Sequence, residues 1–332
     1  MRVLVTGGAG YIGSHTVKTL DKAGFEVAVF DNFSTGHREL VSVSNVIEGD
    51  LMSEHDVRSA FAEFPCDAVM HFASLIQVGE SFHDPQKYYA ANLINSLNLL
   101  DGMLEAGVDT FIFSSSAAVY GDPEAVPILE THPRRPANPY GQTKSFVESI
   151  LLDYARAYGL RFISLRYFNA AGADPEGELG ELHEPETHLI PNILRSLLEE
   201  DRTLEIFGTD FPTPDGTAVR DYIHVSDLAD AHVLALQRLL EGLESGFINL
   251  GANQGYSVRE VIHKTEEVTG RTVEYSEGPR RKGDVPVLLA SRARAEEWLG
   301  WRPLHSDLET IIRTAWEWHR RRPPAREPRP KT

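Results

Sequence analysis

Two residues capable of acid–base chemistry stand four positions apart in the segment Tyr140-Gly141-Gln142-Thr143-Lys144. Apolar residues at helical spacing follow, so we expect both side chains on one face of a helix. An ammonium group beside a phenol favours the phenolate and would lower the pKa of Tyr140 from its usual value of about 10. The pair therefore predicts a general base, although Tyr and Lys at this spacing also occur by chance on solvated helices.

A glycine-rich turn stands near the N-terminus, between a short apolar run and a helical pattern: Thr6-Gly7-Gly8-Ala9-Gly10-Tyr11-Ile12-Gly13. Such a turn lets the backbone approach a pyrophosphate at a helix N-terminus. Asp31 ends the next apolar run about 20 residues on, where a dinucleotide ribose needs an acceptor. Because Asp31 would repel a 2′-phosphate and is followed by Asn32 rather than Arg, the pattern favours NAD over NADP. The alternative is a glycine turn in a Rossmann-like fold without a ligand.

The elements that must position these residues alternate between short β-branched runs and helical patterns, which predicts a parallel sheet with helices on both faces. Helices are expected to start near Tyr11, Ser53, Pro85 and Tyr140. The expected strands are 2–6, 26–31, 45–48, 68–72, 110–114 and 161–166. The predicted fold class is therefore α/β, with a Rossmann-type doubly wound sheet and a smaller C-terminal α/β portion for substrate.

The expected domain division follows from where this alternation becomes irregular. Residues 1–169 are predicted to form the NAD-binding domain, with a return segment near 222–250. Residues 170–319 are predicted to hold mainly the substrate, and 320–332 form a basic, Pro-rich tail that we expect to be disordered.

Composition excludes several classes of protein. The 332 residues are 42% hydrophobic and 24% charged, which is typical of a folded globular chain. The chain has 32 Lys and Arg residues and 49 Asp and Glu residues, so its formal net charge is 32 − 49 = −17. This negative charge argues against nucleic-acid and membrane partners. Cys66 is the one cysteine, and the N-terminal apolar run is too short for a signal peptide, so we expect a cytoplasmic protein.

The segment His183-Glu184-Pro185-Glu186-Thr187-His188 contains metal-ligand types of side chain. Pro185 prevents the single helical face on which a helical zinc motif depends, so no metal site is predicted. The chain also has no phosphate-binding P-loop motif and no nucleophile elbow, which argues against a nucleotide triphosphatase and a serine hydrolase.

The chain has, in this order, the glycine turn, a serine run at 114–116 and the Tyr140–Lys144 pair. With these features it resembles the extended short-chain dehydrogenase/reductase family. The resemblance runs from Met1 to about Trp318. It rests further on His71-Phe72-Ala73, Val78-Gly79-Glu80-Ser81, Ser114-Ser115-Ser116-Ala117-Ala118-Val119-Tyr120-Gly121, Arg166-Tyr167-Phe168-Asn169 and Val219-Arg220-Asp221-Tyr222-Ile223-His224-Val225.

The resemblance implies a role for each matching residue. Ser116, Tyr140 and Lys144 would be catalytic. The residues expected at the cofactor are Gly7, Gly10, Tyr11, Ile12, Gly13, Asp31, Asn32, Asp50, Leu51, Phe72, Ala73, Asn92, Ser114, Tyr140, Lys144 and Phe168. Those expected at the substrate are Ser116, Tyr140, Asn169, His188, Leu189, Phe207, Arg220, Arg281, Asp284 and Leu288.

The implied activity is the NAD-dependent interconversion of UDP-glucose and UDP-galactose through transient oxidation at C4. The chain departs from the best-known pattern at Ile76, His188 and Leu288. Leu288 bears on specificity, because smaller residues there tend to admit 2-acetamido sugars, and Leu is intermediate in size. A dehydratase is disfavoured because Ala117 and Ala118 stand where such relatives carry an acid. Epimerisation of UDP-N-acetylglucosamine or a UDP-pentose and a non-catalytic NAD sensor remain alternatives. The resemblance also implies a homodimer through the helices starting near Pro85 and Tyr140.

Overall fold

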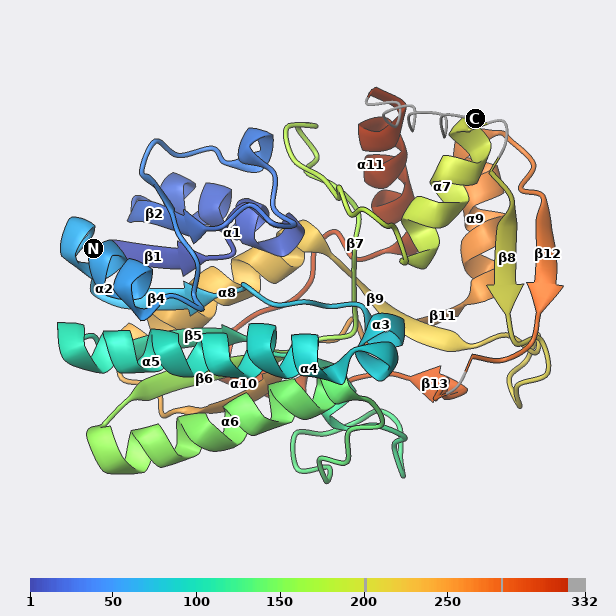
Figure 1. The fold of residues 1–332 in the computed structure, drawn as a ribbon. Helices are drawn as coiled ribbons and strands as arrows, with labels where there is room; N and C mark the ends of the chain where they lie inside the picture. The colour runs from blue at the N-terminus through green and yellow to red at the C-terminus, as the bar shows by residue number, and fades with distance from the viewer. Residues whose placement is uncertain (200–201, 282, 322–332) are drawn as a thin grey trace.

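A computed structural model describes residues 1–199, 202–281 and 283–321. Its largest feature is a seven-stranded sheet in the order β10-β6-β5-β4-β1-β2-β3 (Figure 1). Every neighbouring pair in this sheet is parallel. The strands are β1 (Arg2–Thr6), β2 (Glu26–Asp31), β3 (Val46–Glu48), β4 (Ala68–His71), β5 (Thr110–Ser114), β6 (Arg161–Arg166) and β10 (Gly246–Asn249).

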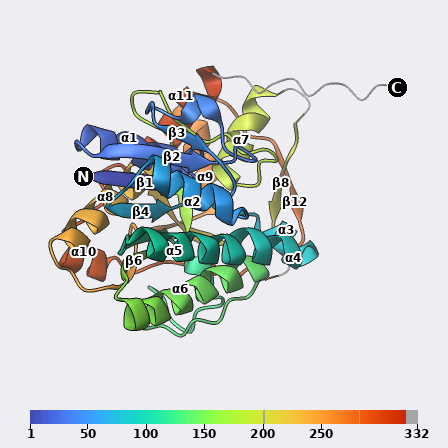
Figure 2. The same ribbon diagram turned by 60° about the vertical axis from the view of Figure 1, so that its left-hand side comes forward.

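Helices cover both faces of this sheet because successive strand residues point to opposite sides. On one face, Val3 and Val5 of β1 share a core with α1 and α8. On the other, Leu4 belongs to a core with α2, α5 and α6. Figure 2 shows α5 and α6 lying side by side along this second face. The helices are α1 (Tyr11–Lys22), α2 (Glu54–Glu63), α5 (Asn95–Ala106), α6 (Pro139–Tyr158), α8 (Val225–Leu240) and, beside β10, α10 (Ala293–Leu299). The predicted doubly wound parallel sheet is confirmed.

The carboxyl ends of the parallel strands lie along one edge, and the chain changes direction there. It runs from β1 outward to β2 and β3, then returns to β4 on the other side of β1 and continues to β5 and β6. Ligands of open α/β sheets bind outside such a switch point. The glycine turn after β1 and the loop after β4 are therefore the two segments next to the expected binding position.

The segment after β4 has more helix than the sequence patterns predict. A short helix α3 (Val78–His83) precedes α4 (Pro85–Tyr88), whose start at Pro85 was expected. A π-helical turn, Tyr89–Ile94, joins α4 to α5, so that helix runs from Pro85 to Ala106. Two short 3-10 turns complete the N-terminal half, at Arg38–Leu40 and Ala117–Val119.

A second, smaller group of elements lies beside this sheet, at the right of Figure 1. One small sheet has the order β11-β9-β13, with β7 also paired to β9, and β8 pairs with β12. Their strands are β7 (Asn169–Ala171), β8 (Leu204–Phe207), β9 (Val219–His224), β11 (Gly255–Ser257), β12 (Tyr275–Gly278) and β13 (Val287–Leu288). Their helices are α7 (Leu189–Leu198), α9 (Val258–Thr269) and α11 (Leu308–Arg321), which share a hydrophobic core.

The structure describes only the first two residues of the predicted tail. Arg320 and Arg321, placed in the predicted tail, form the last residues of α11, and 322–332 lie outside the described residues. Among the described helices, none combines the length and the apolarity that a membrane span would need.

Candidate active site

The glycine turn after β1 is packed too closely for side chains at two of its glycines. Gly7 has φ +73°, and a Cβ there would lie 2.4 Å from the backbone nitrogen of Ala73. A Cβ on Gly13 would lie 2.2 Å from the carbonyl oxygen of Gly7. Gly10 caps α1 without any side-chain hydrogen bond, so the first turn of this 12-residue helix keeps backbone N–H groups for an anion.

Tyr11 and Ile12 begin that helix, but the Tyr11 side chain points away from the turn. Its buried hydroxyl donates to the carbonyl oxygen of Gly172 at 2.6 Å. Burial, and then the carboxylates of Glu181 and Glu186, raise the pKa of Tyr11 well above its usual value. Tyr11 can therefore serve a pyrophosphate through its backbone, while its side chain joins α1 to the loop after β7.

Asp31 is held at the end of β2 by two backbone donors. Its Oδ2 accepts from the N–H of Ala9 at 3.0 Å, and its Oδ1 accepts from that of Phe33 at 2.9 Å. Burial raises the pKa of Asp31, and these hydrogen bonds oppose that rise. The carboxylate is fixed beside the glycine turn and retains lone pairs for a ribose.

The residues expected at the adenosine end separate into an exposed pair and a core residue. Asn32 donates to Oδ2 of Asp50 at 3.1 Å, so the two side chains lie together beyond Asp31. Leu51 instead is buried in the core with Phe30. Leu51 can contribute packing under an adenine, but its side chain is not a surface contact.

Phe72 and Ala73 adjoin the glycine turn on the side of β4. Both donate their backbone N–H to the carbonyl oxygen of Thr6, at 2.8 and 3.1 Å. Asn92 acts behind them, since its amide accepts from the N–H of Leu75 and donates to the carbonyl of Leu75 and to Thr143. The Asn92 side chain thus fastens the loop after β4 to α6.

Helix α6 places Tyr140 in its first turn. The side chain of Asn138 caps the helix by accepting from the N–H of Gly141 at 2.8 Å, and Pro139 occupies the first position. Tyr140 is hydrogen-bonded with Ser116, which lies just past β5. Ser116 Oγ also accepts from the N–H of Ala118 at 3.1 Å, and this fixes its orientation.

Lys144 lies one turn further along, in the interior. Its ammonium donates to Ser74 Oγ at 2.7 Å and to the carbonyl oxygen of Ser114 at 2.8 Å. It is 5.9 Å from the centre of the Tyr140 ring. Burial lowers the pKa of Lys144 to about 7, and Glu148 opposes that shift. Ser114 uses its own hydroxyl in a hydrogen bond with Tyr167.

The expected pKa of Tyr140 needs a correction. Burial raises the pKa of this phenol, and the Ser116 hydrogen bond reverses the effect only in part. Both groups are buried, and desolvation disfavours the phenolate and the ammonium alike, an effect that the spacing of the two residues along the chain does not show. A poised phenolate at this site therefore needs a positive charge from a bound ligand in addition to Lys144.

Sequence reasoning missed Glu148, which lies four residues beyond Lys144 on the buried side of α6. Its carboxylate accepts from Ser115 at 2.8 Å, from Ser164 at 3.0 Å and from both nitrogens of the Arg166 fork at 2.8 and 2.6 Å. It joins α6 to the ends of β5 and β6. A carboxylate on the apolar stripe of a helix was the available signal.

Six of the residues expected at the substrate lie in two places. A small pocket groups Asn169, His188 and Leu189 with Tyr222. The guanidinium of Arg281 covers the Phe207 ring at 5.0 Å and lies 3.4 Å from Asp284 Oδ2.

Arg220 lies on β9, next to β13. It donates to the carbonyl oxygens of Val219 and Val285, both at 2.9 Å. Leu288 is the β13 residue paired with Arg220. Leu288 and Phe168 both pack against the buried cluster that contains Ala117. Leu288 and Phe168 thus lie on the Ser116 side of the predicted site.

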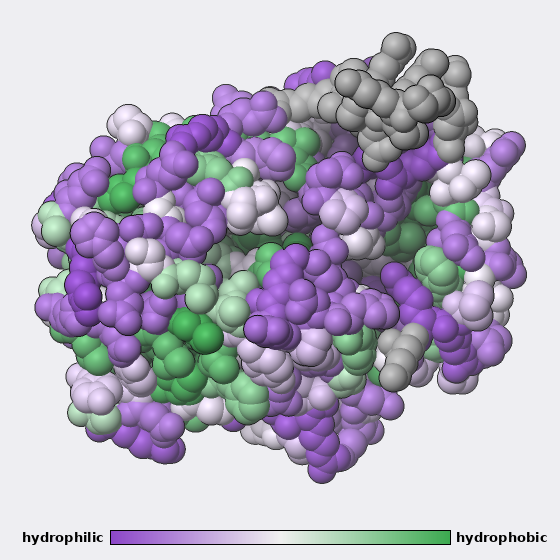
Figure 3. Space-filling view, in the orientation of Figure 1, coloured by the Kyte–Doolittle hydropathy of each residue, from purple (hydrophilic) through white to green (hydrophobic). Residues whose placement is uncertain are grey.

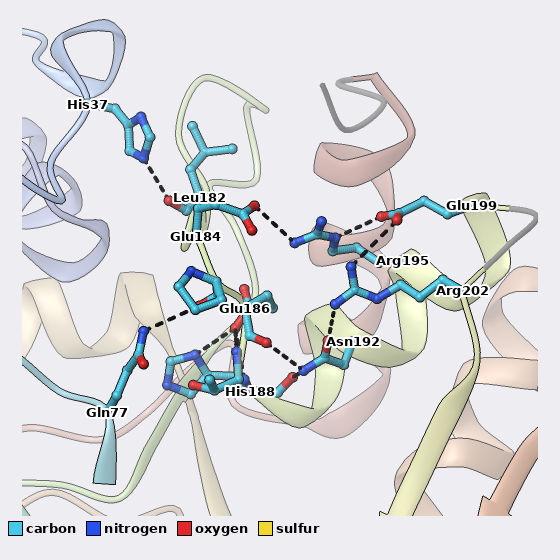
Figure 4. A network of polar contacts seen from close by, with 12 residues as sticks. His37, Gln77, Leu182, Glu184, Glu186, His188, Asn192, Arg195, Glu199 and Arg202 are labelled. Carbon is cyan, nitrogen blue, oxygen red and sulfur yellow. Dashed lines mark hydrogen bonds and ion pairs between the residues drawn. The ribbon is translucent and has the colours of Figure 1, made fainter. Parts of the chain in front are cut away.

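Residues 183–188, for which no metal site is predicted, belong to the loop before α7. This loop brings together the side chains of Glu181, His183, Glu186 and His188. Figure 4 shows Glu186 and His188 within this polar network. A shared helical face was therefore not needed to bring these donors together.

Comparison with known proteins gives consistent results. Residues 3–251 match the model of the NAD dependent epimerase/dehydratase family. The chain is 47% identical to a "UDP-glucose 4-epimerase" of Lacticaseibacillus casei over 324 residues, covering 97% of this chain and 98% of that protein.

Solved structures agree. A UDP-glucose 4-epimerase from Brucella ovis in complex with NAD has a TM-score of 0.92 and 48% identity, over 95% of this chain and 97% of that one. The enzyme of Bifidobacterium longum in complex with NAD+ and UDP has a TM-score of 0.92 and 38% identity, over 97% and 99%. The chain therefore belongs to the NAD dependent epimerase/dehydratase family.

Proposed function

We propose that this protein is a UDP-glucose 4-epimerase that interconverts UDP-glucose and UDP-galactose with NAD as its resident cofactor. One observation carries the proposal: Ser116, Tyr140 and Lys144 meet at the sheet edge that also carries the glycine turn. The relatives and solved structures named above have the same activity in their names and cover nearly the whole chain.

In this proposal Tyr140 removes the proton from the sugar O4 and later returns it. Ser116 donates a hydrogen bond to the same oxygen, because its hydroxyl is held next to Tyr140. NAD, held by the glycine turn and Asp31, would supply a hydride acceptor for C4 that can return the hydride to the opposite face of the sugar. Its positive nicotinamide and Lys144 would together offset the burial that raises the pKa of Tyr140.

We assign cofactor binding to the sheet edge. The backbone of the glycine turn and the start of α1 would hold the pyrophosphate, and Asp31 the adenosine ribose. Phe72 and Ala73 would flank the middle of the cofactor. Residues 1–169, together with 222–250, would form the cofactor domain, since β10 and α8 complete its sheet and one of its cores.

We assign the nucleotide sugar to the smaller group of elements. Arg220 and Arg281 supply cations for a diphosphate in a chain whose net charge is −17. Asn169, His188 and Leu189 line the pocket between β7 and α7. Residues 170–319 would then form mainly the substrate domain.

The deciding experiment mixes the purified protein with UDP-galactose and no added NAD. Appearance of UDP-glucose without net formation of reduced nicotinamide supports the proposal. Turnover of UDP-N-acetylglucosamine or UDP-xylose alone would move the assignment to a sibling epimerase. Failure to convert any UDP-sugar would favour a non-catalytic NAD-binding sensor.

Activity on 2-acetamido sugars is a second candidate, which rests on Leu288, a side chain of intermediate size at this position. This side chain packs, as Phe168 does, against the buried cluster that contains Ala117, where a bulkier residue would narrow the space for the sugar. Comparison of UDP-glucose with UDP-N-acetylglucosamine as substrates separates the two specificities.

We further propose a homodimer formed through α5 and α6, in the cytoplasm. Figure 3 shows a hydrophobic patch over these two helices. Phe146 of α6 is 42% exposed and Ile94, just before α5, is 44% exposed, which is costly for large apolar side chains unless a partner covers them. A molar mass of a monomer, measured by light scattering, would contradict the dimer.

The proposed cytoplasmic location rests on the single cysteine, which suits a reducing compartment.

A further inference from the structure

The loop between β7 and α7 brings four metal-ligand side chains to one point. Glu181 Oε1 lies 2.8 Å from Nδ1 of His183 and 2.8 Å from Nδ1 of His188. Nδ1 of His188 lies 3.0 Å from Oε1 of Glu186. One ligand atom from each of the four residues lies within 4.8 Å of all the others.

These separations fit the first coordination sphere of a small cation. With metal–ligand bonds of about 2.0–2.1 Å, the ligand atoms of a tetrahedral site lie ~3.4 Å apart. Atoms that are 2.8–3.0 Å apart reach that spacing by small outward movements of four side chains. Two imidazole nitrogens and two carboxylate oxygens are a donor set that zinc accepts.

Burial and charge make a cation favourable here. The side chains of Glu181 and Glu186 are only 4% and 2% exposed. Among the described residues, the ion pairs of these two carboxylates are with His183 and His188 alone. Because neither carboxylate has a lysine or arginine ion-pair partner among the described residues, their negative charges can balance those of a bound divalent ion.

A second acidic cluster lies in the same loop between β7 and α7, and it differs in having a lysine partner. Asp174, Glu176 and Glu178 also converge, but the ammonium of Lys18 lies 2.7–2.8 Å from all three. That cluster already has its cation. The Glu181 cluster has imidazole nitrogens where the other has an ammonium group.

The cluster lies between the two parts of the proposed active site. The His183 ring meets the Tyr11 ring edge-on at 6.1 Å, and Tyr11 begins α1. His188 occupies the position just before α7 and lines the pocket that we assign to the nucleotide sugar. A bound ion would thus fix the loop that connects the cofactor turn to the substrate pocket.

We propose that Glu181, His183, Glu186 and His188 bind one divalent transition-metal ion, zinc by their ligand types, as a structural site that fixes this loop. All four positions of the ion are filled by protein. It therefore takes no part in the oxidation and return of hydride, and the proposal does not depend on the identity of the sugar.

The test uses the full chain without a polyhistidine tag, stripped with a chelator and then titrated with zinc chloride. We expect one zinc per chain to remain after desalting and to raise the melting temperature. Magnesium chloride, whose ion prefers octahedral oxygen ligands, should do neither. Failure to retain zinc, or zinc binding without a rise in melting temperature, would overturn the proposal.

Variants distinguish this site from adventitious surface binding. His183→Gln and Glu181→Gln should each weaken zinc binding by at least about tenfold. The matched control is His263→Gln, because His263 is a 77% exposed histidine of α9 that also pairs with a glutamate. Equal zinc binding by His183→Gln and His263→Gln would overturn the proposal.

Cobalt tests the geometry of the site in the wild-type protein, so the result does not depend on whether a variant folds. The stripped wild-type protein with cobalt chloride should show the visible absorption of a tetrahedral site, and one equivalent of zinc should abolish it. A spectrum identical to that of aqueous cobalt would contradict the four-ligand site.

Discussion

The ammonium group of Lys144 donates to the carbonyl oxygen of Ser114 at 2.8 Å, and this bond ties the first turns of α6 to the end of β5. Ser116 follows two residues beyond that carbonyl, and Tyr140 precedes Lys144 by one turn. The lysine therefore sets the distance between the strand that carries the hydroxyl and the helix that carries the phenol. Its substitution would disturb both partners at once.

The substitution Tyr140→Phe removes the proposed general base and leaves the ring. We expect kcat for UDP-galactose to fall by about 10²–10⁴-fold, with the fold unchanged. Tyr158→Phe at the exposed end of the same helix is the control and should keep full activity. Near-normal turnover by Tyr140→Phe would reject the base assignment.

The substitution Glu148→Gln breaks the buried pair with Arg166 and leaves the guanidinium without a counter-charge. We expect a loss of roughly 3–5 kcal/mol in the free energy of unfolding, measured with urea. The control is Asp153→Asn in the same helix, whose pair with Arg156 is 76% exposed on both sides, so the loss should stay below about 1 kcal/mol. Equal losses in the two variants would contradict a special role for Glu148.

The buried Lys144 predicts a pH dependence of stability. Burial lowers its pKa from 10.5 to about 7, so between these values the unfolded chain binds the proton and the folded one releases it. Stability therefore rises with pH across this window, and the cost of burial is fully present below pH 7. Thermal melting of the wild type and of Lys144→Met at several pH values checks this. The difference between them should shift in favour of the wild type as pH rises; a constant difference would refute the lowered pKa.

The glycine turn gives a prediction about the cofactor. Gly13→Ala places a Cβ 2.2 Å from the carbonyl oxygen of Gly7, so the turn must open and the protein should be purified with little NAD. Gly79→Ala is the matched control, because its Cβ in α3 would meet nothing within 4 Å. Released nicotinamide, measured after denaturation, reports the cofactor content. Full occupancy in Gly13→Ala would show that the pyrophosphate lies elsewhere.

Leu288 predicts sugar specificity. Leu288→Tyr adds volume next to the buried cluster that contains Ala117, and we expect kcat/KM for UDP-N-acetylglucosamine to fall relative to that for UDP-glucose by roughly 10–200-fold. Leu304→Tyr, at a side chain that is 78% exposed, should leave the ratio unchanged. An unchanged ratio in Leu288→Tyr would place the sugar away from β13.

The sheet and the common helix of Tyr140 and Lys144 could be predicted because their signals are local. The glycine turn, the β-branched runs and the Tyr140–Lys144 spacing each lie within a few neighbouring residues, where backbone geometry alone determines the outcome. The predicted strand 110–114 agrees residue by residue with β5. The helix start expected at Tyr140 lies one residue from its observed start at Pro139.

The rest of the site depends on contacts between distant segments. The hydrogen bond from Arg166 to Glu148 and that from Tyr11 to Gly172 follow from packing, which a pattern along the chain does not show. The direction of the Tyr140 pKa likewise depends on how deeply the phenol is buried. The grouping of Glu181 with His188 depends on the path of a loop that has no periodic pattern.

The last strand of the large sheet has a consequence for the synthesis of the chain. β10, at Gly246–Asn249, pairs with β6, although β7, α7, β8 and β9 of the smaller group stand between the two strands in the sequence. During translation β6 therefore remains an open edge, with unpaired backbone groups, until about three quarters of the protein has left the ribosome. A fragment that ends near residue 170 would expose this edge, along with the face that α8 covers, and would be prone to aggregate.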